Sequence, residues 1–322
     1  MVYFDSALLH NTLLENYQPM SPFFKSAQVY SLRRNDVIDT KEIENQLASQ
    51  AFKPCASQDK ESVGWTPIIG ELFALVQGNN LLIKWQREEK ILPSTVVKEE
   101  VAKRAAVREE QQERRLKKTE RDALKDEVIH AFMPRAFTRQ KFAFVWIDLD
   151  NSRVVVNASS AKQAENILAL LRKSIGSLPV VPFTLESPMS LTAKEWLASQ
   201  ELPAQFHTGD SVRLSGVVEG TGSVAYTKSE IFSDEVVTNI NNGKIVAAIG
   251  LNWNERISFK IDDGLSITGI KFADILTEQN NDISREDVAI RFDADFLLFR
   301  SEFNEMFSAL VAALGGEVVY GA

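Results

Sequence analysis

Hydrophobic and polar positions along the chain follow two periods, and each period predicts a different kind of element. Apolar residues recur every three or four positions, as in amphipathic helices, over 39–47, 161–174, 192–199, 233–241 and 292–314. Runs rich in β-branched and aromatic residues predict strands over 81–85, 142–147, 154–156, 212–214, 217–219, 224–229, 244–251, 257–261 and 267–272. Helical and strand segments are interspersed, so the pattern predicts a chain of mixed α and β structure with two or more domains.

Local signals predict where several elements end. Asp39 or Thr40 is expected to cap the first helix, and Gly176 to end the second. Asn151 and Ser152 are expected in the turn of a hairpin formed by strands 142–147 and 154–156. Residues 178–183 have the pattern of an extended connection, which makes them a candidate domain boundary.

The stretch between Pro93 and Pro134 differs from the rest, because its forty residues contain neither Gly nor Pro. Residues 108–115 include no apolar side chain, and a helix that is polar all round projects into solvent instead of packing on a core. Thr119, with Asp122 three positions later, is typical of a new helix start. We therefore expect two helices, 95–117 and 120–133, that form a projecting finger.

The net charge of −8 argues against a nucleic-acid partner, but the charge is unevenly distributed. Residues 84–139 hold fifteen Lys and Arg against eleven Asp and Glu. The remainder holds 21 basic and 33 acidic residues. A basic element on an acidic body is thus expected, and local patches decide what such a protein binds.

Basic residues concentrate in the finger, where residues 114–125 hold six of them against two acidic ones. Phosphate contact requires positive groups within reach of a regular backbone. The candidates for DNA contact are Arg114, Arg115, Lys117, Lys118, Arg121, Lys125, Arg135 and Arg139. The alternative is a solvated helix face whose charges are balanced by Glu109, Glu110 and Glu113 through pairs along the helix.

Phe137 lies between Arg135 and Arg139. An aromatic side chain in that position can stack on a base, insert at a duplex step, or pack into a partner subunit. The alternative is a loop aromatic that packs on its own domain.

The candidate catalytic groups form weak patterns. Neighbouring carboxylates occur at Asp148 with Asp150, Asp262 with Asp263, and Asp293 with Asp295, whereas a two-metal nuclease needs three or four that converge. The first two pairs are typical of turns. The histidines are dispersed, and residues 219–223 lack the Gly-Lys-Ser/Thr ending of a phosphate loop. We expect no catalytic residue, no metal ligand and no cofactor.

The single cysteine, Cys55, rules out an intramolecular disulfide framework and is expected to pack as a small apolar side chain. No run of eighteen apolar residues and no secretion signal is evident, so no membrane partner is expected. A reducing compartment, the bacterial cytoplasm, fits this pattern best.

Several blocks resemble the RdgC family of recombination-associated proteins. They are 54–59 followed by Gly64 and Trp65, 88–94, 116–127, 168–182 and 291–296. They occur in the family's order from Met20 to the C-terminus. Residues 1–19 have no counterpart, and residues 66–86 and 201–232 match poorly.

The resemblance implies a multi-domain α+β chain and a ring-shaped homodimer. The implied parts are a central body (20–92 and 142–182), a helical finger (93–141), a base domain (183–285) and a C-terminal helix (286–322) that packs back on the body, after an unmatched extension (1–19). It also implies a protein without enzymatic activity that encircles double-stranded DNA independently of sequence and restrains the RecA recombinase. Nucleoid association in the cytoplasm follows, and single-stranded DNA is a further candidate ligand.

Two residues carry roles by position in the resemblance. Phe137 matches a fingertip aromatic that closes the ring against the partner. Lys228 matches a basic residue of the base domain linked to DNA contact, although its neighbour Ser229 departs from the amide side chain expected there. Two alternatives stay open: a metal-dependent nuclease acting on recombination intermediates, and a module that docks on RecA without binding DNA.

Overall fold

The described strands form one twelve-stranded sheet in a computed structural model that describes residues 21–217, 222–284 and 286–318. The strand order is β2-β4-β5-β6-β1-β12-β11-β10-β8-β9, with β3 paired to β4 and β7 paired to β1. All of these pairings are antiparallel. The expected mixture of helices and strands is therefore confirmed.

The sheet has two parts that meet between β1 and β12, through the residue pairs Ser26–Thr268 and Ala27–Ile267. The first part, the body sheet, contains β1 (Ser26–Leu32), β2 (Glu61–Thr66), β3 (Ala74–Gln77), β4 (Asn80–Ile91), β5 (Phe137–Asp148), β6 (Arg153–Val156) and β7 (Val180–Pro182). The other part, the second sheet, contains β8 (Phe206–Gly216), β9 (Ser223–Thr227), β10 (Lys244–Trp253), β11 (Ile257–Asp262) and β12 (Ile267–Phe272).

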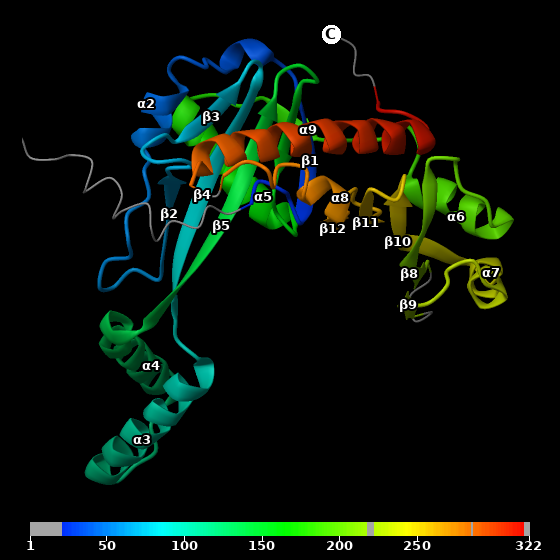
Figure 1. The fold of residues 1–322 in the computed structure, drawn as a ribbon. Coiled ribbons are helices and arrows are strands. Elements are labelled where there is room, and N and C mark those ends of the chain that lie inside the picture. Colours follow the sequence, from blue (N-terminus) through cyan, green and yellow to red (C-terminus); the bar gives the residue numbers. More distant parts are fainter. Residues whose placement is uncertain (1–20, 218–221, 285, 319–322) are drawn as a thin grey trace, which may run out of the picture.

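The body sheet is covered on both faces. Helices α2 (Ile43–Ala48) and α5 (Ala161–Ile175) cover one face, over a core that includes Leu81, Ile83 and Val145. Helix α9 (Val288–Ala313) lies along the other face (Figure 1). The rings of its Phe296, Phe299 and Phe303 surround Trp146 at centroid distances of 6.3, 5.7 and 5.9 Å. This aromatic cluster is how the C-terminal helix packs on the body.

Two expected helices of the body have different outcomes. Helix α5 matches the prediction, because it spans Ala161–Ile175 and Gly176, at φ 83°, follows its last turn. Ser160 Oγ, which was not predicted as a cap, accepts from Gln163 N. The caps expected at Asp39 or Thr40 are wrong. Helix α2 begins at Ile43 after Glu42, and Asp39 Oδ1 instead accepts from Lys41 N at 2.9 Å in the preceding turn.

Strands β4 and β5 form a ribbon that leaves the body and ends in two helices (Figure 1). The ribbon is paired over its whole length, from Asn80–Asp148 to Ile91–Phe137. Residues 143–148 are buried in the body, whereas residues 137–141 are exposed. Helices α3 (Ser94–Gln112) and α4 (Lys118–Phe132), with a 3-10 turn (Met133–Arg135), complete the finger. The expected strand 142–147 is therefore the inner half of a longer strand.

The two finger helices are confirmed, but the end of α3 and the start of α4, on either side of the turn that connects them, differ from the prediction. Helix α3 stops at Gln112, because Glu113 adopts a left-handed conformation with φ 52°. Helix α4 begins at Lys118 and not at Thr119, because the Glu120 carboxylate accepts from the backbone N–H of Lys117 at 2.7 Å.

Within the described residues, helices cover one face of the second sheet. Helices α6 (Met189–Ser199) and α7 (Asp234–Asn241) pack on the face that presents Leu214, Ile249 and Ile261. A short helix, α8 (Asp274–Thr277), and another 3-10 turn (Asn35–Val37) complete the described elements. Strand β8 is longer than the expected 212–214.

Some expectations lie outside the described residues. They include the unmatched segment 1–19 and positions 218 and 219 of the strand expected over 217–219. Within the described ranges, no helix is long and apolar enough to cross a membrane.

Candidate nucleic-acid interface

The far end of the finger is a basic turn, residues 113–117, which is fixed by apolar contacts and a hydrogen bond of Leu116. Leu116 is buried against Ala105 and Leu124, and its N–H donates to Glu109 Oε1 at 2.8 Å. These contacts fold the connection between α3 and α4 back on the helices. Four of the expected DNA-contacting residues lie exposed on or beside this turn: Arg114, Arg115, Lys117 and Lys118.

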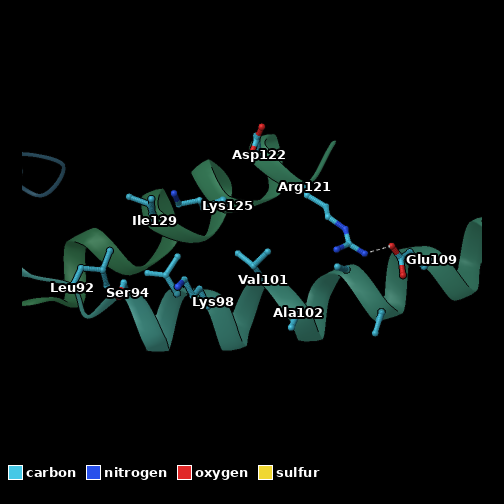
Figure 2. A pocket seen from close by; sticks show the side chains of 13 residues that line it. Leu92, Ser94, Lys98, Val101, Ala102, Glu109, Arg121, Asp122, Lys125 and Ile129 are labelled. Atoms are coloured by element: carbon cyan, nitrogen blue, oxygen red, sulfur yellow. Dashed lines mark hydrogen bonds and ion pairs between the residues drawn. The ribbon is translucent and has the colours of Figure 1, made fainter. Parts of the chain in front are cut away.

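Two of the candidate DNA-contacting arginines near the far turn, Arg114 and Arg121, form ion pairs with carboxylates. Arg114 makes a bidentate pair with Glu120, with N–O distances of 2.8 and 2.7 Å. This hydrogen bonding, together with the Lys117 N–H, lowers the pKa of Glu120 to about 2. Arg121 reaches across from α4 to Glu109 Oε1 on α3 at 2.8 Å, as Figure 2 shows. The hydrogen bond from Arg121 is also the main cause that lowers the pKa of Glu109.

Glutamates therefore neutralise some of the basic side chains of the finger but not all of them. Pairs across the helices, such as Arg108 with Glu127 at 2.7 Å, contribute more to this neutralisation than pairs along one helix. Exposed pairs of this kind stabilise by at most about 1 kcal/mol. In the described part of the chain, Arg115, Lys117 and Lys118 form no ion pair, so their charges are available to an anionic partner.

Lys125 lies on the inner side of the finger. With Arg121 and Asp122 it borders a groove of about 580 Å³ between α3 and α4 (Figure 2). The groove is mainly apolar and is lined by Leu92, Val97, Val101, Ala102, Ala105, Ala106 and Ile129, among others. Lys125 has no ion pair in the part of the chain that the structure describes.

Arg135, Phe137 and Arg139 lie at the other end of the finger, where the helices meet the ribbon. The Nε of Arg139 donates to Glu89 Oε1 at 2.8 Å, whereas Arg135 is exposed on the 3-10 turn. Phe137 pairs with Ile91 across the ribbon and is 85% exposed. The length of α3 puts the far turn roughly 28 Å from Phe137. The expected role of Phe137 in closing a ring stays a prediction. The exposure of Phe137 contradicts packing on its own domain.

Lys228 lies far from the finger, at the end of β9 in the second sheet (Figure 1). It is exposed, with φ 54°, and the next N–H, of Ser229, donates to Asp210 O at 3.2 Å. The structure thus brings Arg114, Arg115, Lys117, Lys118, Arg121 and Lys125 together on the outer finger. It places Arg135 and Arg139 at the root of the finger and Lys228 on a separate surface.

Carboxylates in the two aspartate pairs expected in turns accept hydrogen bonds from neighbouring groups of the protein. Asp148 is buried and accepts from Asn151 and from Asn304 Nδ2 at 3.0 Å, and Asp150 accepts from Asn79 and Asn80. Asp262 Oδ1 accepts from two backbone N–H groups of its own turn. Over residues 21–217, 222–284 and 286–318, no three His, Cys, Asp or Glu side chains lie close enough to hold a metal ion.

Sequence reasoning missed three basic residues of the second sheet, Arg213, Lys260 and Lys271. All three are exposed on β8, β11 and β12. The alternation within each strand places each of them on the polar side. Lys260 and Lys271 line the same depression as Lys228, and this proximity depends on the strand order, which the pattern of a single strand does not contain.

Comparisons with known proteins agree on one family. The family model described as "RdgC: Putative exonuclease, RdgC" matches residues 22–317. The recombination-associated protein RdgC of Yersinia pestis (strain Pestoides F) is 47% identical over 299 residues, which cover 92% of this chain and 98% of that protein. The protein of the same name from Yersinia enterocolitica is 46% identical over the same shares of each chain. The match is long, in register and well above the identity at which relatives share a fold, and the chain therefore belongs to the RdgC family.

Proposed function

We propose that the protein binds double-stranded DNA independently of sequence, as a homodimer that encircles the duplex, and thereby restrains the RecA recombinase on the nucleoid. The relatives are named for recombination, a process whose substrate is DNA. The observation that carries the proposal is the far turn of the finger, where Arg115, Lys117 and Lys118 are exposed and form no ion pair with any described residue.

The chemistry of this turn suits phosphates and not bases. Lysine and arginine contacts to phosphate oxygens position a protein on DNA but carry no sequence information. Such binding releases counterions, so its affinity falls steeply with salt. A basic turn at the far end of the finger helices, which project from an acidic chain, presents the positive charge where a polyanion meets it first.

The homodimer is supported by the apolar surface at the finger's root. Phe137 is 85% exposed and its ribbon partner Ile91 is 42% exposed. Exposed apolar groups that lie side by side are typical of protein contact sites. In a dimer, these two residues would be covered by the second copy and the ring would close.

A nuclease is the second candidate, because the family model's description names an exonuclease. The carboxylates do not favour a nuclease. Asp148 and Asp150 accept hydrogen bonds from asparagine side chains. Among the described residues, no three His, Cys, Asp or Glu side chains form a group that could bind a metal ion. A module that docks on RecA without DNA is the third candidate.

The test incubates the full-length protein with three unrelated duplexes of equal length, in Mg²⁺ and, separately, in Mn²⁺. Equal affinity for the three duplexes and intact DNA would support the proposal. Shortened strands would establish the nuclease. Capture of RecA in the absence of any DNA binding would establish the docking module.

A further inference from the structure

An exposed loop of the body contacts the root of the finger. This loop, residues 53–60, precedes β2 and lies beside the outer end of β4, where Lys90 N–H donates to Lys60 O at 2.9 Å. We call it the root loop. Cys55 is half-buried, and the other residues of the loop are exposed. Apolar burial therefore contributes little to the position of the loop, which depends on hydrogen bonds.

One set of hydrogen bonds fixes the root loop on the ribbon. Cys55 N–H donates to Glu88 Oε1 at 2.9 Å, and Gln140 Nε2 of β5 donates to Glu88 Oε2 at 3.3 Å. Within the loop, Ala56 N–H donates to Asp59 Oδ2 at 2.9 Å. Glu88 is buried, and a buried carboxylate requires such donors. Its side chain thereby connects the loop to both strands of the ribbon.

A second set of hydrogen bonds joins the root loop to the finger. Gln58 Nε2 donates to His130 O, in the last turn of α4, at 3.3 Å. Lys90 Nζ donates to Ser57 O at 2.7 Å and to Met133 O at 3.0 Å. Lys90 thus connects the loop, strand β4 and the 3-10 turn that follows α4.

The finger carbonyls in these bonds lack helical partners. The last carbonyls of a helix have no donor within it. His130 O would accept from the residue four positions later, but this residue is Pro134, which has no N–H. Gln58 supplies the missing donor. Lys90 brings a positive charge to the C-terminal end of α4, where the helix dipole favours it. The body therefore supplies donors that the finger itself does not provide.

The ribbon alone provides weak support for the finger. The pairing of β2 with β4 ends at the pair Glu61–Glu89, and β6 pairs with β5 only over residues 145–148. In the described part of the chain, the outer end of the ribbon (residues 89–91 with 137–139) thus has two strands and no third. Two-stranded ribbons are marginally stable by themselves and twist strongly. The root loop is therefore what can fix the direction of the finger.

We infer that the root loop is a latch that holds the finger at one angle to the body. When Gln58 and Lys90 release the finger carbonyls, the finger swings about the outer end of the ribbon. The bonds are exposed, so water can replace each of them when the loop opens. Because α3 makes the finger roughly 28 Å long, the swing displaces the basic turn more than any other part.

This inference goes beyond the proposed function, because it concerns the movement of the finger and not what the finger binds. Its test contains no DNA. Failure of the latch and failure of DNA binding are therefore separate results.

The test compares two double variants of the full-length protein. The latch variant, Gln58→Ala/Lys90→Met, removes the donors to the finger carbonyls and keeps most of the length of the lysine side chain. The control, Lys103→Met/Gln111→Ala, makes the same substitutions at exposed positions of α3 that lie away from the root loop.

The distance between the finger and the body is measured by pulsed electron spin resonance. One spin label replaces Lys118, at the start of α4, and the other replaces Lys173 on α5, and both positions are exposed. A keto-bearing amino acid carries each label, so Cys55 is not modified. An excess of unlabelled chain removes distances between copies. Hydrogen exchange is measured on the same variants without labels.

The inference expects one narrow distance distribution in the wild type and the control, and a broader distribution in the latch variant. The amides of Cys55 and Lys90 should exchange at least about tenfold faster in the latch variant, because two hydrogen bonds that close the loop are lost. Exchange over α3 and α4 should stay unchanged, since a swing leaves both helices intact.

Three results would overturn the inference. The first is a latch variant whose distance distribution is as narrow as that of the wild type. The second is a distribution that is already broad in the wild type. The third is faster exchange throughout α3 and α4, because the finger would then unfold and not swing.

If the double variant does not fold, Gln58→Ala replaces it. Gln58 is exposed, so its truncation leaves no cavity in a core. The expected broadening of the distance distribution is smaller but in the same direction. A folded Gln58→Ala protein with the wild-type distribution would equally overturn the inference.

Discussion

At the scale of single residues, the basic side chains of the finger are not equivalent. Arg114 and Arg121 are engaged with Glu120 and Glu109, whereas Lys117 and Lys118 are not paired in the described chain. An arginine that already holds a carboxylate must break that pair before it can contact a phosphate. If the finger binds DNA as proposed, we expect Lys117 and Lys118 to contribute more to the affinity than Arg114 and Arg121 do.

This difference predicts that Lys117→Glu/Lys118→Glu weakens duplex binding at least about tenfold and flattens its salt dependence, because two phosphate contacts are removed. Arg114→Gln should weaken binding by less than about threefold. Fluorescence anisotropy over a salt series measures both variants. An equal effect of the two variants would show that pairing with Glu120 does not restrain Arg114.

A second residue-scale prediction concerns pH. The Arg114 hydrogen bonds hold the pKa of Glu120 at about 2, below its ordinary value near 4.5. A depressed pKa in the folded state means that the carboxylate stabilises the turn fully above about pH 4.5. This contribution is lost as the pH falls toward 2. In an NMR titration, Arg114→Ala should raise the pKa of Glu120. No change in the titration would mean that the pair does not form in solution.

At the scale of elements, the finger helices share a very small core. Its buried members are Ala105, Leu116 and Leu124, with Val101 packed beside them. The body, by contrast, has two large clusters on the faces of its sheet. A unit with so few buried contacts opens locally at a lower free energy than the rest of the molecule.

Leu124→Ala should therefore loosen the finger and leave the body intact. Leu124 is fully buried, and such truncations cost about 2–5 kcal/mol. Hydrogen exchange should accelerate over residues 94–132 and stay unchanged in β5 residues 143–148. Ala123→Ser, at an exposed position of the same helix, is the control. Faster exchange throughout the chain would contradict an independent finger.

Elements with strong local signals could be predicted from the sequence, and those set by tertiary contacts could not. Helix α5 has an apolar stripe and a terminal glycine, and both predict it correctly, whereas its Ser160 cap was not predicted. The start of α4 depends on Glu120 reaching back to Lys117 N–H, which outweighs the Thr119 signal. The outer ribbon is mostly polar, so its strands have no periodic signature and only their mutual hydrogen bonds define them.

The candidate site divides in the same way. A run of basic residues between two helices is visible in sequence, and the structure places it on one turn. The position of Phe137 beside Ile91 could not be predicted from the sequence. It depends on the pairing of β4 with β5, which places both residues where the ribbon meets the finger helices. Lys260 and Lys271 belong to different strands, and only the register of β10, β11 and β12 brings them to one surface.

At the scale of the whole molecule, the finger and the second sheet extend from opposite ends of the body (Figure 1). The basic turn, the exposed Phe137 and Lys228 thus lie on separate parts of one chain. Two such chains would enclose a duplex only if each end meets its counterpart. Contacts between the copies and contacts with phosphates would then be made by different residues.

This separation predicts distinct effects for Phe137→Ala. The variant should lower the dimer's stability and its retention on DNA without changing thermal melting of the body, because the side chain is 85% exposed and supports no core. Light scattering over a concentration series measures the dimer. Ile275→Ala, at a position that is 72% exposed on α8, is the matched control. Equal dimer stability in both variants would exclude Phe137 from the interface.

Duplex binding through phosphates and as a dimer can be measured in one experiment. Binding to a short duplex of random sequence is followed over a salt series, and the mass of the complex is determined in the same buffers. We expect a linear fall of log K with log salt and a complex that contains two chains and uncut DNA. Affinity independent of salt, or a single chain on the DNA, would contradict this expectation.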